Sequence, residues 1–210
     1  MSEVRAVIVA AASAEQLAGF AVRPDLVVAA DSGLHAVLEH GWVPDRLVGD
    51  LDSATPDAVD EAERHGVPVD RHPETKNETD LELAIATALA DGATDVHVVV
   101  RPGGRLDHQL ANLVVLASPE WADATISASI GDHSVWVVRG RRSIDVEVGQ
   151  QLALVPVGGP ATVTSRGVAY PLDREVLSPF AGRGIANEAT ATQVAIDVHD
   201  GVVLVLSSPG

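Results

Sequence analysis

Acidic residues follow several stretches of this sequence that have the pattern of buried strands. The sharpest example is the run Gly49–Ser53, which reads GDLDS, and the others are Asp31, Asp80 and Asp107. If the strands form one parallel sheet, these acids converge on its carboxyl edge, where open α/β sheets bind ligands. Clustered carboxylates repel one another unless a cation joins them, and Mg2+ usually bridges protein carboxylates and substrate phosphates. The pattern therefore predicts phosphoryl-type transfer rather than simple binding.

Asp50 and Asp52 lie on either side of Leu51 in the chain. In an extended segment, residues two apart share one face, so both carboxylates can reach one Mg2+ while Leu51 turns into the core. Ser53 can then cap the segment or donate to a phosphate. The residues alone leave an alternative open, which is a turn that carries two solvated acids.

Lys76 is the only lysine among the 14 lysine and arginine residues of the chain. A compact ammonium is a common phosphate ligand, so this isolated lysine is a candidate for phosphate binding. Asp80, four residues later, begins a predicted helix and can join Lys76 in holding metal and phosphate. The alternatives are that Lys76 is solvated and that Asp80 only interacts favourably with the helix dipole.

A glycine-containing loop follows another apolar stretch. Gly103 and Gly104 allow backbone N–H groups to approach a phosphate, and Arg105 offers a bidentate fork. A simple turn that needs glycine for its backbone angles would explain the same pattern. Asp107 is a candidate N-cap as well as a candidate ligand, and His108 is either a general base or a structural histidine.

Composition excludes several classes of protein and site. The net charge of −16 argues against binding to nucleic acids or anionic membranes, and the absence of cysteine excludes disulfides, thiolate nucleophiles and Cys-ligated metals. No H-E-x-x-H, G-x-S-x-G or Walker A motif is present. Residues 1–12 are too short and too acidic for a signal peptide, and no apolar run reaches about 18 residues. We therefore expect a cytoplasmic protein.

The first 130 residues alternate between strand-like and helical patterns, which is the signature of an α/β domain. Helix starts are predicted at Thr55-Pro56 and at Thr79, where Glu82 completes a capping box, and a further helix is predicted over 107–117. The predicted strands span residues 4–10, 25–30, 46–49, 67–71 and 96–100.

The pattern changes near residue 131, after which no helix is predicted. Short strand-like segments separated by glycine and proline indicate a small antiparallel sandwich or barrel over 131–210. The predicted strands span residues 135–138, 144–148, 152–157, 161–165, 193–198 and 202–206.

Taken in order, these motifs resemble those of the thiamine pyrophosphokinase (thiamine diphosphokinase) family. The resemblance extends over nearly the whole chain, and its blocks are specific as an ordered set. They are ADSG at 30–33, GDLDS at 49–53, KNETDLE at 76–82, GGRLDH at 103–108 with LAN at 110–112, GVAYPL at 167–172 and GIANE at 184–188.

The resemblance implies transfer of a diphosphate from ATP to the hydroxyethyl oxygen of thiamine, which gives thiamine diphosphate and AMP. It implies Mg2+, ATP and thiamine as ligands and a homodimer, with thiamine near the subunit interface. An α/β domain, 1–130, would bind the nucleotide and carry catalysis. A β domain, 131–210, would bind thiamine and form the dimer.

Residue roles also come from the resemblance. The metal ligands it implies are Asp50, Asp52 and Asp80. The catalytic residues it implies are Asp52, Lys76, Asp80 and Arg105. The nucleotide-binding residues it implies are Asp31, Gly103, Gly104, Arg105, Asp107 and Asn112. The thiamine-binding residues it implies are Asp107 and Asn187.

Three departures from the family pattern affect these roles. Asn77 replaces a frequent aspartate, Arg101-Pro102 replaces small residues, and Ala186 replaces the usual serine before Asn187. Two rival functions remain open from the residues. One is diphosphate transfer to another small alcohol, such as a hydroxymethylpterin, and the other is a nucleotide- or thiamine-binding module without turnover. The intact set of aspartates favours catalysis, because a pure binder has little need to gather repelling acids.

Overall fold

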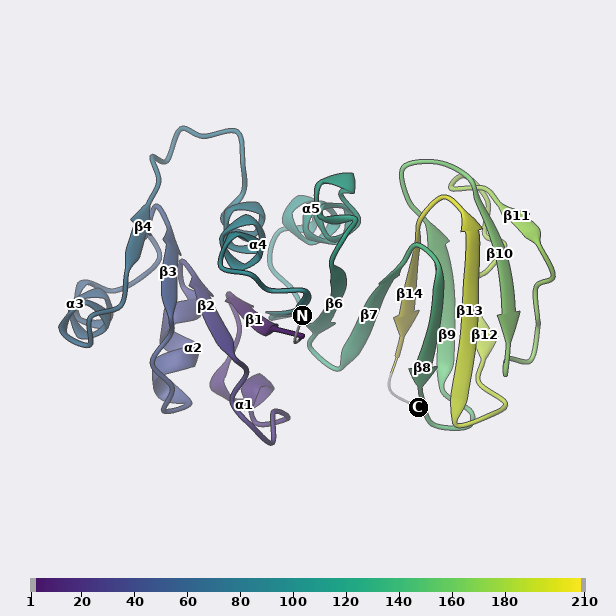
Figure 1. Cartoon of the computed structure of the whole chain (residues 1–210), viewed down its shortest axis with the longest axis horizontal. Helices are drawn as coiled ribbons and strands as arrows, with labels where there is room; N and C mark the ends of the chain where they lie inside the picture. Colours follow the sequence, from purple (N-terminus) through teal and green to yellow (C-terminus); the bar gives the residue numbers. More distant parts are fainter. Residues whose placement is uncertain (1–2, 209–210) are drawn as a thin grey trace. The chain divides into compact units, whose positions relative to one another are not determined.

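The computed structural model describes residues 3–208 and divides into two compact units. The first unit runs up to Val115 and includes Asp123–Gly131, and the second comprises Leu116–Ala122 and the chain from Asp132 onward. Figure 1 shows helices and strands interleaved in the first unit and strands alone after residue 131. The predicted fold class, a mostly parallel α/β sheet followed by an all-β sandwich, is confirmed. Among the described residues, no helix has the length and apolar character needed to cross a membrane.

The sheet of the first unit is entirely parallel. Its strands are β1 (Arg5–Ala10), β2 (Leu26–Ala30), β3 (Arg46–Gly49), β4 (Val69–Arg71), β5 (Asp95–Val100) and β6 (Thr125–Ile130). Strand β1 pairs with β2 on one side and β5 on the other; β3 and β4 extend the first side, and β6 extends the second. The chain therefore changes direction across the sheet between β1 and β5. Such a switch point leaves a crevice at the carboxyl ends of the two strands.

Helices cover both faces of this sheet (Figure 1). One core cluster joins β1–β3 to α1 (Ala14–Leu17), α2 (Gly33–Glu39) and α3 (Pro56–Arg64). Helix α4 (Asp80–Ala90) packs on β1, β2 and β3 through its buried stripe, which is Leu81, Ala84, Ile85 and Ala88. The strands bury both faces, which explains why their sequences are continuous apolar runs.

Gly33 allows α2 to approach β1 closely. A Cβ atom at this position would lie 1.8 Å from the carbonyl oxygen of Val9, so no larger residue fits without moving the helix. Because Asp31 directly follows β2 and lies two residues before Gly33, this contact also helps to determine where that acid lies.

The predicted helix starts are largely correct. Thr79 and Glu82 form the predicted capping box, with Thr79 Oγ1 accepting from Glu82 N at 3.2 Å and Glu82 Oε2 accepting from Thr79 N at 2.7 Å. Pro56 opens α3 after Thr55, as expected. Helix α5 spans Leu106–Leu116, so Asp107 lies inside its first turn. The interpretation of Asp107 as an N-cap is therefore wrong.

The second unit is a sandwich of two antiparallel groups of strands. One group has the order β12-β9-β14-β7 and the other β11-β10-β13-β8. Buried side chains from both groups share one core cluster, for example Leu154 and Val205 with Val163 and Ile196. The strands are β7 (His133–Val138), β8 (Arg141–Asp145), β9 (Gln151–Pro156), β10 (Ala161–Arg166), β11 (Glu175–Leu177), β12 (Asn187–Glu188), β13 (Gln193–Asp200) and β14 (Val203–Ser207).

Some elements differ from their predictions. The strand predicted over 144–148 is present but displaced by three residues, because β8 occupies Arg141–Asp145, and Val148 is exposed. Strand β8 is polar, and its backbone pairs with β13 in spite of its sequence. Strand β6 was not predicted, because Thr125, Ser127 and Ser129 interrupt its apolar pattern.

We expect the ion pair between Arg46, at the start of β3, and Asp91, after α4, to stabilise the first unit in a pH-dependent way. Arg46 Nε and Nη2 donate to the two carboxylate oxygens at 2.7 and 2.9 Å, and this hydrogen bonding lowers the pKa of Asp91 below its ordinary value of 3.8. A lowered pKa gives stability that is present above pH 3.8 and lost as the pH falls through the folded-state value.

Asp91→Asn should accordingly lower the free energy of unfolding by about 1 kcal/mol at pH 7. The difference from the wild type should shrink below about pH 4, as urea titrations at several pH values can measure. Asp60→Asn, at an exposed position of α3, is the matched control and should show no such difference. A pH-independent effect at Asp91 would contradict the ion-pair explanation.

Candidate active site

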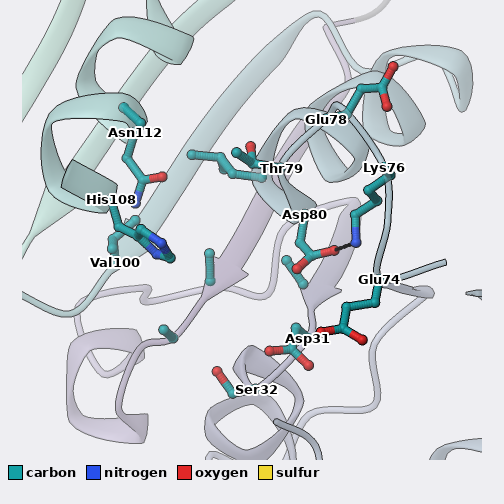
Figure 2. Close-up of a pocket in the computed structure, with 15 residues that line it drawn as sticks. Asp31, Ser32, Glu74, Lys76, Glu78, Thr79, Asp80, Val100, His108 and Asn112 are labelled. Carbon is teal, nitrogen blue, oxygen red and sulfur yellow. Dashed lines mark ion pairs between the residues drawn. The ribbon is translucent and has the colours of Figure 1, made fainter. Parts of the chain in front are cut away.

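A pocket of about 460 Å3 lies at the carboxyl edge of the parallel sheet. It is lined by the ends of β1, β2 and β5, by the loop before α4, and by one face of α5 (Figure 2). This is the switch point between β1 and β5, where open α/β sheets bind ligands, and the volume is typical of a small-molecule site. The polar lining residues are Asp31, Ser32, Glu74, Lys76, Glu78, Thr79, Asp80, His108 and Asn112.

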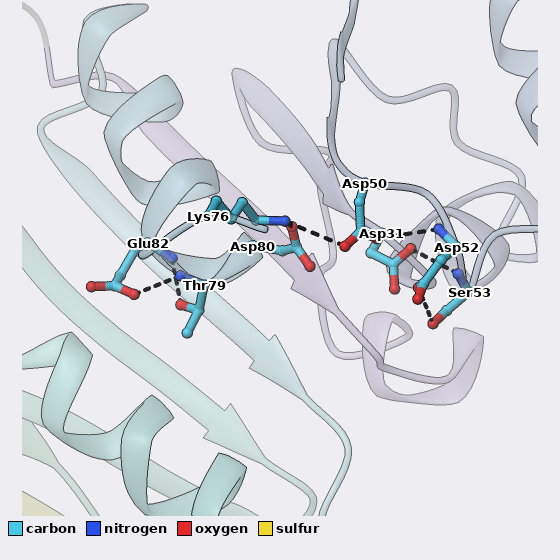
Figure 3. A network of polar contacts seen from close by, with 8 residues as sticks. All are labelled: Asp31, Asp50, Asp52, Ser53, Lys76, Thr79, Asp80 and Glu82. Atoms are coloured by element: carbon cyan, nitrogen blue, oxygen red, sulfur yellow. Dashed lines mark hydrogen bonds and ion pairs between the residues drawn. The ribbon is translucent and has the colours of Figure 1, made fainter. Parts of the chain in front are cut away.

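Three of the predicted acids form a group beside this pocket, which we call the acid cluster: Asp31, Asp50 and Asp52. Each offers a carboxylate oxygen, and these three atoms lie within 4.8 Å of one another. Figure 3 shows their side chains converging from the ends of β2 and β3. The convergence expected from the order of the strands is therefore present for these acids.

The backbone conformation that places Asp50 and Asp52 differs from the one predicted. Leu51 has a left-handed φ of 63°, so the segment is a turn and not an extended strand end. Asp50 Oδ1 accepts a hydrogen bond from Asp52 N at 3.2 Å across this turn. Leu51 is nevertheless buried in the core, as predicted. Because left-handed backbone is unfavourable for a residue such as leucine, the turn holds local strain, a feature that gathers at functional sites.

Asp31 also has a left-handed φ, of 46°, and its carboxylate belongs to a local hydrogen-bond network. Ser53 N donates to Asp31 Oδ1 at 3.3 Å, and Ser53 Oγ donates to Asp52 Oδ1 at 2.9 Å (Figure 3). Burial raises the pKa of Asp31, with a smaller contribution from the neighbouring charge of Asp80, although the hydrogen bonds from Ser32 and Ser53 oppose the shift. The cluster thus places at least one carboxylate where its charge is disfavoured.

Lys76 lies between two carboxylates and is only 11 % exposed, so the interpretation of it as a solvated surface residue is wrong. Its Nζ atom is 2.9 Å from Asp80 Oδ1 and 3.4 Å from Asp50 Oδ2. Partial burial opposes the charge of Lys76, but the contacts with Asp80 and Asp50 outweigh it and raise the pKa of the ammonium. A hydrogen bond from the backbone N–H of Asp52 lowers the pKa of Asp50, and the positive charge of Lys76 lowers it further.

The donor atoms of this region suit a hard cation. All three members of the acid cluster offer carboxylate oxygens, which Mg2+ prefers to nitrogen or sulfur ligands. In addition, Asp80 Oδ1 is buried and accepts no hydrogen bond among the described residues, its contact being the ion pair with Lys76. The residues present therefore fit a divalent metal. Asp31 is one of the three members of the acid cluster, and Asp80 is linked to the cluster because Lys76 contacts both Asp80 and Asp50.

The glycine loop lies outside this pocket lining. Gly103 and Gly104 both have left-handed backbone, with φ of 91° and 81°. The Arg105 guanidinium donates to both oxygens of Asp107, at 3.1 and 2.6 Å, and this pairing lowers the pKa of Asp107 to about 2. Both side chains are exposed, so Asp107 does not join the other acids as the strand order had suggested.

Several residues that line the pocket had not been predicted as site residues from the sequence. Glu74 and Glu78 bring two more carboxylates, and Ser32 and Thr79 bring hydroxyl groups. The two glutamates lie two residues before and after Lys76, so the same loop signal could have found them. From α5, His108 and Asn112 reach the pocket, which places both sequence candidates across it from Lys76 and Asp80 (Figure 2).

Asn187 lies in the second unit, beside a smaller pocket of about 170 Å3. It is 3 % exposed, and its amide is engaged within the fold. Its Oδ1 atom accepts from Tyr170 N and Glu188 N, both at 3.0 Å, and its Nδ2 atom donates to Tyr170 O at 2.9 Å. Asn187 therefore supports the wall of this second-unit pocket, whose other lining residues are Tyr170, Leu172, Gly182, Arg183, Gly184, Ile185 and Ala186.

Comparison with known families gives two matches along the chain. A model described as thiamin pyrophosphokinase, catalytic domain, matches residues 20–128, and one described as thiamin pyrophosphokinase, vitamin B1 binding domain, matches residues 141–203. The thiamine pyrophosphokinase of Bacillus subtilis (strain 168) is 23% identical over 195 residues, which cover 91% of each chain.

Solved structures show the same fold. The crystal structure of thiamine pyrophosphokinase from Bacillus subtilis has a TM-score of 0.84 at 22% identity and covers 97% of this chain and 98% of its own. The enzyme from Candida albicans has a TM-score of 0.75 at 16% identity, covering 99% of this chain and 90% of its own. At these identities the likeness establishes the architecture alone.

Gly49 offers a test of how tightly the acids are packed. It has a φ of 141°, and an added Cβ atom would lie 3.2 Å from Asp80 Oδ1 and 3.3 Å from Asp31 Cβ. Gly49→Ala should therefore combine backbone strain with crowding between two carboxylates, and we expect it to destabilise the protein by about 2–3 kcal/mol.

The matched control is Gly92→Ala, which has a φ of 95° and open space around its Cβ position. It should cost only the backbone term, about 1 kcal/mol. Urea unfolding measures both, and equal losses would show that the methyl group is accommodated without disturbing the acids.

Proposed function

Because the chain belongs to the thiamin pyrophosphokinase family, we propose that it transfers a diphosphate group from ATP to the hydroxyethyl oxygen of thiamine, giving thiamine diphosphate and AMP. The observation that carries the proposal is the acid cluster, with Lys76 beside it, in a pocket at the switch point of the sheet. Family membership favours thiamine over another small alcohol as the acceptor, and the gathered carboxylates favour turnover over simple binding.

The reaction forms a bond from the thiamine hydroxyl oxygen to the β-phosphorus of ATP. The bond between that phosphorus and the oxygen bridging to the α-phosphorus breaks, and AMP leaves. Phosphoryl transfers of this kind need positioning and charge compensation more than covalent chemistry by the protein. We therefore assign the residues of the pocket to binding and orientation.

Asp31, Asp50 and Asp52 would hold Mg2+, with Asp80 as a further ligand. A bound ion would supply positive charge that offsets the charge of the phosphates. Lys76 would place its ammonium against the same diphosphate.

Nucleotide binding is proposed for the glycine loop and α5. Gly103 and Gly104 present backbone N–H groups without side chains, and Asn112 reaches the pocket from α5. Arg105 would exchange its partner Asp107 for a phosphate, since both side chains are exposed to solvent. Asp107 would then be available to the acceptor.

We assign nucleotide binding and catalysis to residues 1–130 and thiamine binding and dimerisation to residues 131–210. The second-unit pocket supports this division. Tyr170 and Ile185 expose apolar surface in its lining, and the hydrogen bonds of Asn187 to the Tyr170 backbone hold its wall in place. In the proposed homodimer, this pocket of one subunit completes the acceptor site of its partner. The cytoplasm remains the proposed compartment.

The function is tested by incubating the protein with ATP, Mg2+ and thiamine and measuring thiamine diphosphate and AMP. A hydroxymethylpterin in place of thiamine tests the rival acceptor. Asp50→Asn and Asp52→Asn should each lower turnover by about 100-fold or more while the fold persists, because each removes a charged ligand of the Mg2+ that would position the diphosphate. Asp60→Asn is the matched control. Near-normal activity of both cluster variants would rule out the proposed role of the acids.

The shared site is tested by mixing two inactive variants. Asp52→Asn spoils the acid cluster, and Ile185→Asp places a charge in the second-unit pocket at a position that is 56% exposed. Ile185→Asp avoids the structural amide of Asn187. If the site is shared, mixed dimers should regain part of the activity through one intact composite site. A pull-down with two tags must first show subunit exchange; absence of recovery despite exchange, or a monomer in solution, would contradict the proposal.

A further inference from the structure

The ammonium of Lys76 compensates the negative charge of nearby carboxylates, as a bound metal ion would. Its ammonium contacts Asp80 at 2.9 Å and Asp50 at 3.4 Å, and it is largely shielded from water (Figure 3). Four other side chains that line the pocket at the sheet edge are carboxylates: Asp31, Glu74, Glu78 and Asp80. Lys76 is therefore the main compensation for several neighbouring carboxylates.

The positions of these groups place Lys76 in competition with a divalent cation. Asp50 belongs both to the acid cluster and to the ion pair with Lys76. Mg2+ binds carboxylate oxygens at about 2.0–2.1 Å, so an ion on Asp50 would lie close to the ammonium. The two positive charges would repel each other strongly in a partly buried site.

Lys76 can leave this position without disturbing Asp80. It lies in the loop between β4 and α4, outside both elements, and its side chain is a flexible four-carbon stem. Asp80 is held by the start of α4, where the capping box of Thr79 and Glu82 fixes the backbone. The ammonium can therefore change partners while the carboxylate stays in place.

We propose that Lys76 is an exchangeable counter-ion, which occupies the carboxylates in the free protein and is transferred to the phosphates when nucleotide binds. Divalent metal then binds weakly to the free protein and tightly with the nucleotide. The coupling is reciprocal, so metal strengthens nucleotide binding by the same factor. This inference rests on the proposed function, because it requires a polyphosphate in the edge pocket.

The test measures Mn2+ binding by the loss of its free electron paramagnetic resonance signal. The nucleotide is α,β-methylene-ATP, whose carbon bridge blocks the proposed reaction. Because the triphosphate binds Mn2+ by itself, its affinity for Mn2+ is measured without protein and subtracted. In the wild type, we then expect the nucleotide to tighten Mn2+ binding to the protein by about tenfold or more. Lys76→Met should bind Mn2+ about tenfold more tightly than the wild type without nucleotide, and should lose most of the coupling.

Two variants separate the effect of the ammonium from general effects of charge. Lys76→Arg keeps a cation in place and should retain weak Mn2+ binding in the free protein. Arg141→Met removes a positive charge from an exposed site in the second unit and should match the wild type. Thermal unfolding of each variant confirms that it is folded.

The proposal is overturned if Lys76→Met and the wild type bind Mn2+ alone with the same affinity, or if neither binds Mn2+ at all. The separate assay for thiamine diphosphate distinguishes this failure from failure of the proposed function. If the wild-type protein makes thiamine diphosphate but Lys76→Met has an unchanged affinity for Mn2+, the proposed function stands and the counter-ion role is refuted. The expected Mn2+ effects without thiamine diphosphate synthesis would support the counter-ion role and refute the acceptor.

Discussion

Repulsion among carboxylates is the constraint on which the first unit depends. Asp31, Asp50 and Asp52 are gathered within 4.8 Å, and Asp80 lies near enough to raise the pKa of Asp31. Like charges at this separation repel one another, so other interactions in the fold must hold these side chains together. It does so with the close contact of α2 on β1, the left-handed turn at Leu51 and the ammonium of Lys76. The backbone strain at Leu51 and the repulsion among the acids both cost stability. They are tolerated because the strands beneath them bury a continuous apolar core.

Much of this arrangement could be predicted from the sequence, because its signals are local. Apolar runs located the strands of the first unit except β6, and the pair Thr79 and Glu82 located the start of α4. The strand order then implied that the acids meet. What local patterns could not give was conformation imposed by tertiary contacts, such as the left-handed Leu51 and the burial of Lys76 between two acids.

The errors have related causes. Strand β6 carries serines that look like loop residues, yet Ser127 and Ser129 bond to the ring of His97 on the neighbouring strand. Strand β8 is polar and is identified only by its pairing with β13. Asp107 follows a strand like the other acids, but Arg105 lies two residues away and captures it. In each case the structure depends on a contact with another residue or strand, and the sequence spacing did not show how important that contact is.

The capping box of α4 has a consequence for how this site can diverge among related proteins. Asp80 belongs to a helix whose start is fixed, whereas Lys76 belongs to the loop that precedes it. Residues added to or removed from that loop would shift the ammonium and leave the carboxylate where it is. Loop length is therefore a means by which evolution can adjust charge compensation in the pocket independently of the acids that the sheet and helices hold.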